Sequence, residues 1–147
     1  MAYFMHFLKS AARWLCAAAA RGVDVRALVP GKNDVRLVQW AGRAAYSRLL
    51  RAGARVYEYQ PRTLHAKTVL VDEEWSTVGT ANFDYRSFFI NYELNLVARS
   101  AQLNAALASL FENDLLAAEE IRKQPWANRP WSNRVAEFIG WSARRWL

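Results

Sequence analysis

A helix, a glycine and a strand follow one another twice within the first half of the chain. The two stretches read AAARGVDV (18–25) and LLRAGARV (49–56). Glycine readily ends a helix in the left-handed conformation, and the valines that follow favour an extended chain. Two such units in succession predict an α/β fold, in which helices pack against a mixed or parallel sheet.

The expected helices and strands alternate along the whole chain. In the first half, the apolar periodicity predicts helices at about 7–20 and 35–52, and strands at 2–4, 23–29 and 54–59. The second half is richer in strands, which are expected at 64–72, 76–79 and 92–98. A helix capped by Ser100 and continuing to about Lys123 follows, and an amphipathic helix at 131–147 ends the chain. We therefore expect one mixed sheet with helices on both faces, formed by residues 1–124, and a tail rich in Trp and Arg at 125–147.

His65 and Lys67 lie two positions apart in a segment, 64–72, that is apolar enough to be a central strand. Side chains two apart on a strand share a face, so the imidazole and the ammonium are expected to project together. Burying both without an anion would be costly, which predicts an anionic ligand. The following segment 79–82, Gly-Thr-Ala-Asn, adds a close backbone approach, a hydroxyl and an amide. Together these groups suit a phosphoryl oxyanion.

The spacing of these residues resembles a known motif. The pattern His65-x-Lys67-x4-Asp72-x6-Gly79-Thr80-x-Asn82 is similar to the HKD motif of the phospholipase D superfamily. The wider stretch HAKTVLVDEEWSTVGTANFDYRSFFINYELNL (65–96) resembles the second HKD half of bacterial cardiolipin synthases, and so do RGVDVRALVPGKND (21–34) and AGARVYEYQP (52–61). The resemblance implies a phospholipase D-like α-β-α sandwich with one HKD repeat.

The resemblance also implies a phosphatidyltransferase that acts on phospholipid phosphodiesters through a phosphohistidine intermediate. His65 would be either the nucleophile or the general acid and base, and the sequence leaves that choice open. Lys67 and Asn82 would hold the phosphate oxygens, and Glu93 would orient the imidazole, as a carboxylate does in a Ser-His-Asp triad.

Three further motif positions receive lesser roles. Gly79 and Thr80 would assist substrate binding, although the family usually has Gly-Ser where this chain has Gly-Thr, and the extra methyl crowds the pocket. Asp72 has the opposite strand parity to the His and Lys, so we expect a structural hydrogen-bonding role. Asp84 and Arg86 are expected to fix a loop as an internal pair. No cluster with metal-ligand spacing is present in the sequence, so neither a metal nor a cofactor is expected.

The family builds its site from two HKD motifs, and this sequence contains one. The second motif would come either from a homodimer partner or from the other half of a longer chain, of which this would be a truncated reading frame or a fragment. Three hypotheses follow: a cardiolipin-synthase-like transferase, a small HKD nuclease or other phosphodiesterase acting as a homodimer, and an inactive half-protein.

Charge and the C-terminal segment bear on partners. The net charge of +7 points to anionic partners, and the Trp-rich end favours a phospholipid of the phosphatidylglycerol type over nucleic acid. The helix at 131–147 either lies on an anionic bilayer or packs on its own domain. No stretch is long enough to span a membrane, so we expect a peripheral location at the cytoplasmic face of a bacterial inner membrane. Cys16, the single cysteine, is expected to be a buried inert thiol.

Overall fold

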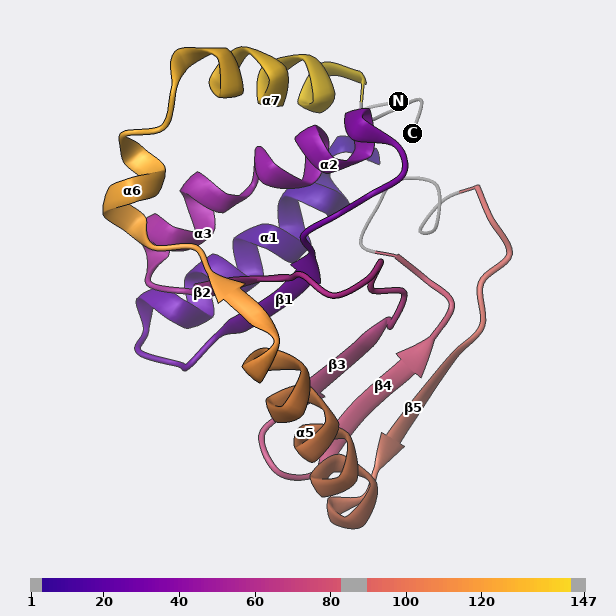
Figure 1. Ribbon diagram of the computed structural model, residues 1–147. Coiled ribbons are helices and arrows are strands. Elements are labelled where there is room, and N and C mark those ends of the chain that lie inside the picture. Colours follow the sequence, from indigo (N-terminus) through magenta and orange to yellow (C-terminus); the bar gives the residue numbers. More distant parts are fainter. Residues whose placement is uncertain (1–3, 83–89, 144–147) are drawn as a thin grey trace.

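The computed structural model describes residues 4–82 and 90–143, and Figure 1 gives its course. The helices are α1 (Phe4–Ala20), α2 (Arg36–Arg43), α3 (Tyr46–Ala52), α5 (Ala101–Leu116), α6 (Lys123–Ala127) and α7 (Trp131–Ala143). The strands are β1 (Arg26–Pro30), β2 (Arg55–Tyr59), β3 (Thr68–Val71), β4 (Trp75–Gly79), β5 (Asn95–Arg99) and β6 (Ala118–Glu120).

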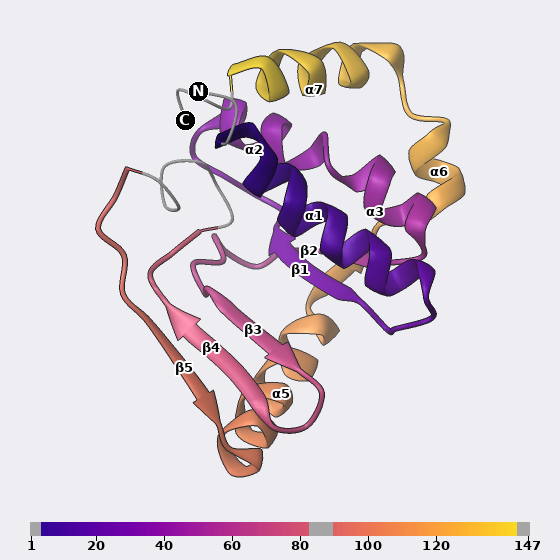
Figure 2. The ribbon, with the colours of Figure 1, turned by 180° about the vertical axis from the view of Figure 1, so that it is seen from behind.

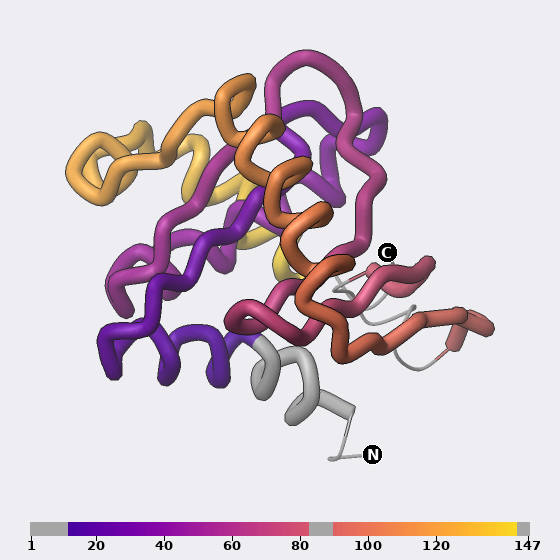
Figure 3. Tube along the Cα trace, turned by 90° about the horizontal axis from the view of Figure 1, so that it is seen from below, coloured from indigo at the N-terminus to yellow at the C-terminus, as the bar shows by residue number. Residues whose placement is uncertain are grey.

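The strands form two three-stranded sheets. In the first, of order β1-β2-β6, β1 and β2 run parallel and β6 runs antiparallel to β2. The second, of order β3-β4-β5, is antiparallel throughout. Helices α1 and α3 lie on one side of the first sheet and α5 on the other, and the view from below shows α5 crossing both sheets (Figures 2 and 3). The predicted α/β class with helices on both faces is therefore confirmed, with the strands divided between two sheets.

The repeated helix–glycine–strand unit is present at both predicted places. Gly22 and Gly53 have φ of +91° and +96° and follow the ends of α1 and α3. After α1, the N–H groups of Gly22 and Val23 donate to carbonyls of the last helical turn at 2.9 and 3.1 Å. The same pair of bonds follows α3, so each glycine ends its helix in a Schellman motif and directs the chain into a strand.

The core lies between the first sheet and helices α1 and α3. Its buried members are Ala19, Tyr46, Leu49, Leu50, Ala54 and Val56. Cys16 packs at the rim of this core, and its Sγ lies 3.7 Å from the carbonyl oxygen of Arg48. The thiol is half-buried, which corrects the expectation of full burial.

A buried ion pair ties the helices to the sheet. Glu58 of β2, only 3% exposed, accepts two hydrogen bonds from the Arg43 guanidinium at 2.9 and 2.8 Å and one from the Tyr46 hydroxyl at 3.1 Å. The bond to Glu58 raises the pKa of Arg43 above its ordinary value. Burial, together with the neighbouring carboxylate, raises the pKa of Tyr46 strongly, so the phenol stays protonated and keeps donating.

Two expected elements are shorter than predicted. The helix predicted at 35–52 is divided into α2 and α3, because glycine at position 42 is a weak helix former and the two halves pack on different neighbours, α7 and β2. The strand predicted at 64–72 is limited to Thr68–Val71, and its position as a central strand is wrong. This strand, β3, forms an edge of its sheet, and Val69 and Val71 are exposed.

The chain ends also differ from expectation. Ser100 caps α5 as predicted, with its Oγ accepting from the Leu103 N–H at 3.3 Å, but the helix ends at Leu116 and not near Lys123. The next residues form β6, whose sequence AEE has little intrinsic strand preference and which exists because it pairs with β2. A strand was predicted at 2–4, and Phe4 is the one residue of this range that the structure describes. Phe4 belongs to α1, so the prediction is wrong for this residue. Asp84, Arg86 and the last four residues of the helix predicted at 131–147 lie outside the described residues.

Replacing Glu58 by Ala should lower the free energy of unfolding by about 3 kcal/mol, because Arg43 and Tyr46 would lose a buried anionic partner. Chemical denaturation measures this change. Glu74→Ala is the matched control, since its pair with Arg99 is exposed on both sides and should contribute less than about 1 kcal/mol. Equal losses in the two variants would contradict the structural role given to Glu58.

Candidate functional site

Several of the predicted site residues lie at one end of the second sheet, where β3 begins and β4 ends. Thr68 pairs with Val78, and Gly79 pairs with Asn95 on β5. The N–H of Gly79 also donates to the carbonyl of Lys67 at 3.1 Å, just before β3. Lys67, Gly79 and Asn95 therefore form one row across the three chain segments, with Gly79 in the middle.

Gly79 has no room for a side chain. A Cβ placed there would overlap Asn95 Oδ1 and the Leu94 carbonyl oxygen, and would lie 2.7 Å from the Cα of Asn95. The glycine thus allows β5 and the Asn95 side chain to lie directly against β4. The sequence predicted a close approach to a ligand, and the structure shows a close approach between strands.

Thr80 connects the end of β4 to β5 through its hydroxyl. Its Oγ1 accepts a hydrogen bond from the Leu94 N–H at 3.0 Å and donates to Glu93 Oε2 at 2.5 Å. Asn91 Nδ2 reaches the other carboxylate oxygen, Oε1, at 3.5 Å. A hydroxyl has one proton, and the Thr80 hydroxyl donates its proton to Glu93. Thr80 therefore positions the Glu93 carboxylate.

Lys67, the first member of this row, and His65 belong to an irregular segment that leads into β3. Lys67 is half-buried as a residue, and its ammonium donates to the His65 carbonyl oxygen at 2.8 Å in an exposed hydrogen bond. His65 is exposed, so the argument that a buried imidazole requires an anion does not apply to it. In the structure, Lys67 is part of the Gly79 row and its ammonium contacts the backbone of His65, and neither residue belongs to a strand.

Two motif residues stand apart from this group. Asp72 lies in the β3–β4 hairpin at the opposite end of the sheet, exposed, with φ of +54°. Asp tolerates this left-handed conformation better than most residues, which gives it a place in the turn. Asn82 is exposed and directly precedes residues 83–89, which are outside the described part of the chain.

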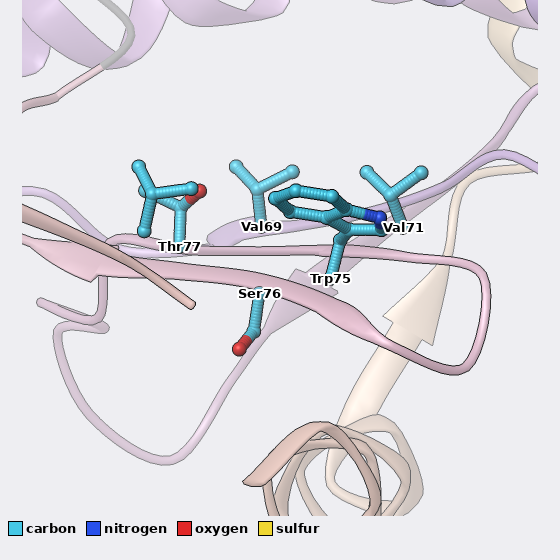
Figure 4. A pocket seen from close by; sticks show the side chains of 6 residues that line it. Val69, Val71, Trp75, Ser76 and Thr77 are labelled. Carbon is cyan, nitrogen blue, oxygen red and sulfur yellow. The ribbon is translucent and has the colours of Figure 1, made fainter. Parts of the chain in front are cut away.

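An apolar hollow adjoins the polar row on the same face of the sheet. The next two rows are Val69–Thr77–Val97 and Val71–Trp75–Arg99. Figure 4 shows Val69, Val71, Trp75 and Thr77 pointing to one side, over a hollow of about 220 Å³, while Ser76 points to the opposite side, toward α5. The Arg99 guanidinium lies 5.9 Å from the Trp75 ring centre. Lys67 is thus at the polar end of an open face on which the next two rows are mainly apolar, apart from Thr77 and Arg99.

Asn95 and Asn91 are the site residues that the sequence reasoning missed. Asn95 follows Glu93 by two positions, so strand parity could have placed both on one face. Its contact with Gly79 depends on the register between β4 and β5, which no local pattern in the sequence encodes.

The fold and the motif together define a phospholipase D-like protein. The chain is similar in structure to Nuc, a phospholipase D family member from Salmonella typhimurium, with a TM-score of 0.68 and 23% identity over 76% of this chain and 72% of that one. This likeness concerns the fold.

The sequence comparisons narrow the class. Residues 1–115 match the family described as "Cardiolipin synthase, PLD-like domain", and the chain belongs to that family. It is 43% identical to cardiolipin synthase A of Pectobacterium carotovorum over 125 residues, which is 85% of this chain and 26% of the relative. The identity to cardiolipin synthase A of Cronobacter sakazakii is 44% over the same shares. The chain therefore spans about a quarter of the length of these relatives.

Gly79→Ala should lower the free energy of unfolding by about 1–3 kcal/mol, because the added methyl would overlap Asn95 and the β5 backbone. Chemical denaturation again measures it. Gly42→Ala is the control: a Cβ there meets no atom within 4 Å, and in α2 it should stabilise by up to about 1 kcal/mol. A Gly79→Ala variant as stable as the wild type would show that β4 and β5 are not in close contact at this point.

Thr80→Val should accelerate hydrogen exchange of the Leu94 amide about tenfold, since that N–H would lose its acceptor. Thr80→Ser keeps the hydroxyl and should leave the exchange rate near that of the wild type. NMR or mass spectrometry of exchanged peptides distinguishes them. If both variants exchange alike, the hydroxyl does not join the two strands.

Proposed function

We propose that this chain supplies one HKD half of a cardiolipin-synthase-type phosphatidyltransferase. The observation that supports the proposal is that the Lys67–His65 contact, the Gly79 row and the Thr80–Glu93 pair occur at the same end of the second sheet, in a chain 43% identical to cardiolipin synthase A. The name of those relatives supports phospholipids as substrates. A lysine, an imidazole and a fixed carboxylate suit a phosphodiester without a metal ion.

The reaction would proceed in two displacements at phosphorus. In the first, an imidazole nitrogen attacks the phosphodiester of the donor lipid, a P–N bond forms, and the P–O bond to the leaving alcohol breaks. A second imidazole gives that alcohol its proton. In the second step, the same group removes the proton of an acceptor hydroxyl, whose oxygen attacks phosphorus as the P–N bond breaks. The phosphatidyl group is thereby moved from one alcohol to another.

Each candidate site residue of this chain would have a role that suits its functional group. His65 would be one of the two imidazoles, and Lys67 with Asn82 would neutralise and bind the phosphate oxygens. Glu93, held by Thr80, would fix the tautomer of an imidazole and stabilise its protonated form. Asp72 lies in a hairpin at the far end of the sheet, and we assign it no part in the chemistry.

A second HKD half would complete the site. The apolar rows next to Lys67 offer it a surface, since Val69, Val71, Trp75 and Val97 are 36%, 51%, 46% and 63% exposed. A partner covering them would bring its own motif against His65. Such a partner is either a second copy of this chain or the remaining part of a longer protein, because the relatives extend well beyond the region matched here.

The proposed substrate places the protein at a membrane surface, which in bacteria we take to be the cytoplasmic face of the inner membrane. Within residues 4–82 and 90–143, no helix combines the length and the apolar content needed to cross a bilayer.

A second candidate, a nucleic-acid phosphodiesterase, is favoured by the net charge of +7. The two differ in salt dependence, because binding to nucleic acid weakens steeply as the salt concentration rises.

His65→Ala should lower phosphatidyl transfer at least about 100-fold. The variant lacks either the nucleophile or the proton-transfer group, depending on which of the two roles His65 has. The assay follows lipid products by mass spectrometry after incubation with phosphatidylglycerol. The chain has two histidines, so His6→Ala is the matched control and should retain activity. Transfer by the His65→Ala variant at the wild-type rate would contradict the proposal, and cleavage of DNA without lipid transfer would favour the second candidate.

An experiment that mixes wild-type and His65→Ala chains distinguishes the two possible sources of the second HKD motif. If two copies share one site, equal amounts of wild-type and His65→Ala chains should give about a quarter of the wild-type activity, because only wild-type pairs are complete. If the second motif comes from another part of a longer protein, this chain alone lacks a complete site and should show no transfer activity.

A further inference from the structure

Helix α7 docks on the protein with its least apolar face. Gly140 is buried against α2, and a Cβ there would lie 2.5 Å from the Ala41 N and 2.7 Å from the Trp40 Cβ. Glu137 is also buried, and it is paired with Arg129 at 2.6 Å. Arg129 in turn lies over the Trp126 ring, at 4.3 Å. The position of α7 on the domain is therefore fixed by a close helix contact and a buried ion pair.

The opposite face of α7 is apolar and exposed. Trp131, Val135, Phe138 and Ile139 recur at helical spacing, and their exposed fractions are 77%, 44%, 68% and 48%. We call these four residues the α7 stripe. At 100° per residue, its centre lies roughly opposite Gly140, so packing on the domain does not cover it. Packing of this helix on its own domain is therefore present, and it leaves the stripe uncovered.

The charge around the stripe is positive. Glu137 is the single acid of α7 and is buried in its pair with Arg129. Arg134 is exposed at the flank of the stripe, where its guanidinium donates to the Ala127 carbonyl at 2.5 Å. In the sequence, Arg144 and Arg145 follow the helix. An exposed helix face with Trp, large apolar residues and Arg, but no exposed acid, is typical of helices that lie in the interface of an anionic bilayer.

We propose that the α7 stripe docks the protein on an anionic phospholipid surface, with the helix axis in the membrane plane. A second copy of the chain fits this surface less well. A helix of 13 residues is about 20 Å long, too narrow a strip for the roughly 800 Å² per partner of a stable interface, and a symmetric contact would bring Arg134 near its own copy. A bilayer has no size limit and supplies the negative charge.

The docking would serve the site described above. In Figures 1 and 2, α7 lies at the top of the molecule, and the Gly79 end of β4 points toward that end while the β3–β4 hairpin points away. A membrane on the stripe would therefore be nearer to the Gly79 end of β4 than to the β3–β4 hairpin, with α2 between the stripe and the site. This orientation rests on the proposed function, whereas the docking itself does not.

Vesicle flotation tests the proposal. The probes are phosphatidylcholine vesicles with and without an equal share of phosphatidylglycerol. The wild-type chain should bind the anionic vesicles, and Trp131→Ser with Phe138→Ser should weaken that binding at least about tenfold. Leu110→Ser with Leu116→Ser is the matched control, since these α5 side chains are similarly exposed, at 61% and 87%, and should not matter. Circular dichroism confirms that each variant is folded.

Three results would overturn the proposal: no binding of the wild type to anionic vesicles, equal binding by the stripe variant, or an equal loss in the α5 control. A wild-type dimer that the stripe variant converts to a monomer in light scattering would assign the stripe to a second copy. Transfer activity in detergent micelles, where docking is not needed, is measured in parallel. Vesicle binding without transfer would count against the proposed function alone, and transfer in micelles without vesicle binding would count against the docking alone.

Discussion

The close contact between β4 and β5 at Gly79 is the constraint on which the site depends. Because no side chain fits there, Asn95 lies directly against the glycine and the two strands keep their register to the end of the sheet. That register brings Thr80 to Leu94 and Glu93. On its other side, Gly79 donates its N–H to the Lys67 carbonyl, which continues the register between β3 and β4. The main effect of Gly79 is thus to let the backbones of β4 and β5 lie close together. The positions of the polar groups around it depend on this strand pairing.

The open face of the second sheet is polar at one end and mainly apolar beyond it, with Thr77 and Arg99 as the polar exceptions. Its other side packs on α5, where Asn104 Nδ2 donates to the Trp75 carbonyl at 2.7 Å. The first sheet, in contrast, carries the core and the Glu58 ion pair, which fix the body of the domain. The residues that stabilise the domain and the residues of the candidate site therefore lie in different sheets. This division explains how a site with exposed groups and an open apolar face can persist on a folded protein.

The sequence predicts those parts of the structure that local chemistry determines. Gly22 and Gly53 end helices because their φ values are positive, and Ser100 caps α5 because its hydroxyl reaches the first turn. The HKD spacing predicts the candidate site residues, whose roles stay predictions, but His65 and Lys67 were expected on a buried strand that in the structure begins only at Thr68. Strand β6 and the contact of Asn95 with Gly79 depend on pairing with distant residues, so no local pattern could indicate them.

The central claim is that His65 and Lys67 bind a phosphodiester at the Gly79 end of the second sheet. Imidazole NMR tests it directly, because the chain has only two histidines and His6→Ala assigns their signals. On titration with a soluble short-chain phosphatidylglycerol, we expect the His65 ring signals to shift until saturation and the shift to disappear in Lys67→Ala. If the His65 signals stay unchanged in the folded wild-type chain, or shift equally without Lys67, the site does not bind phosphate in this way.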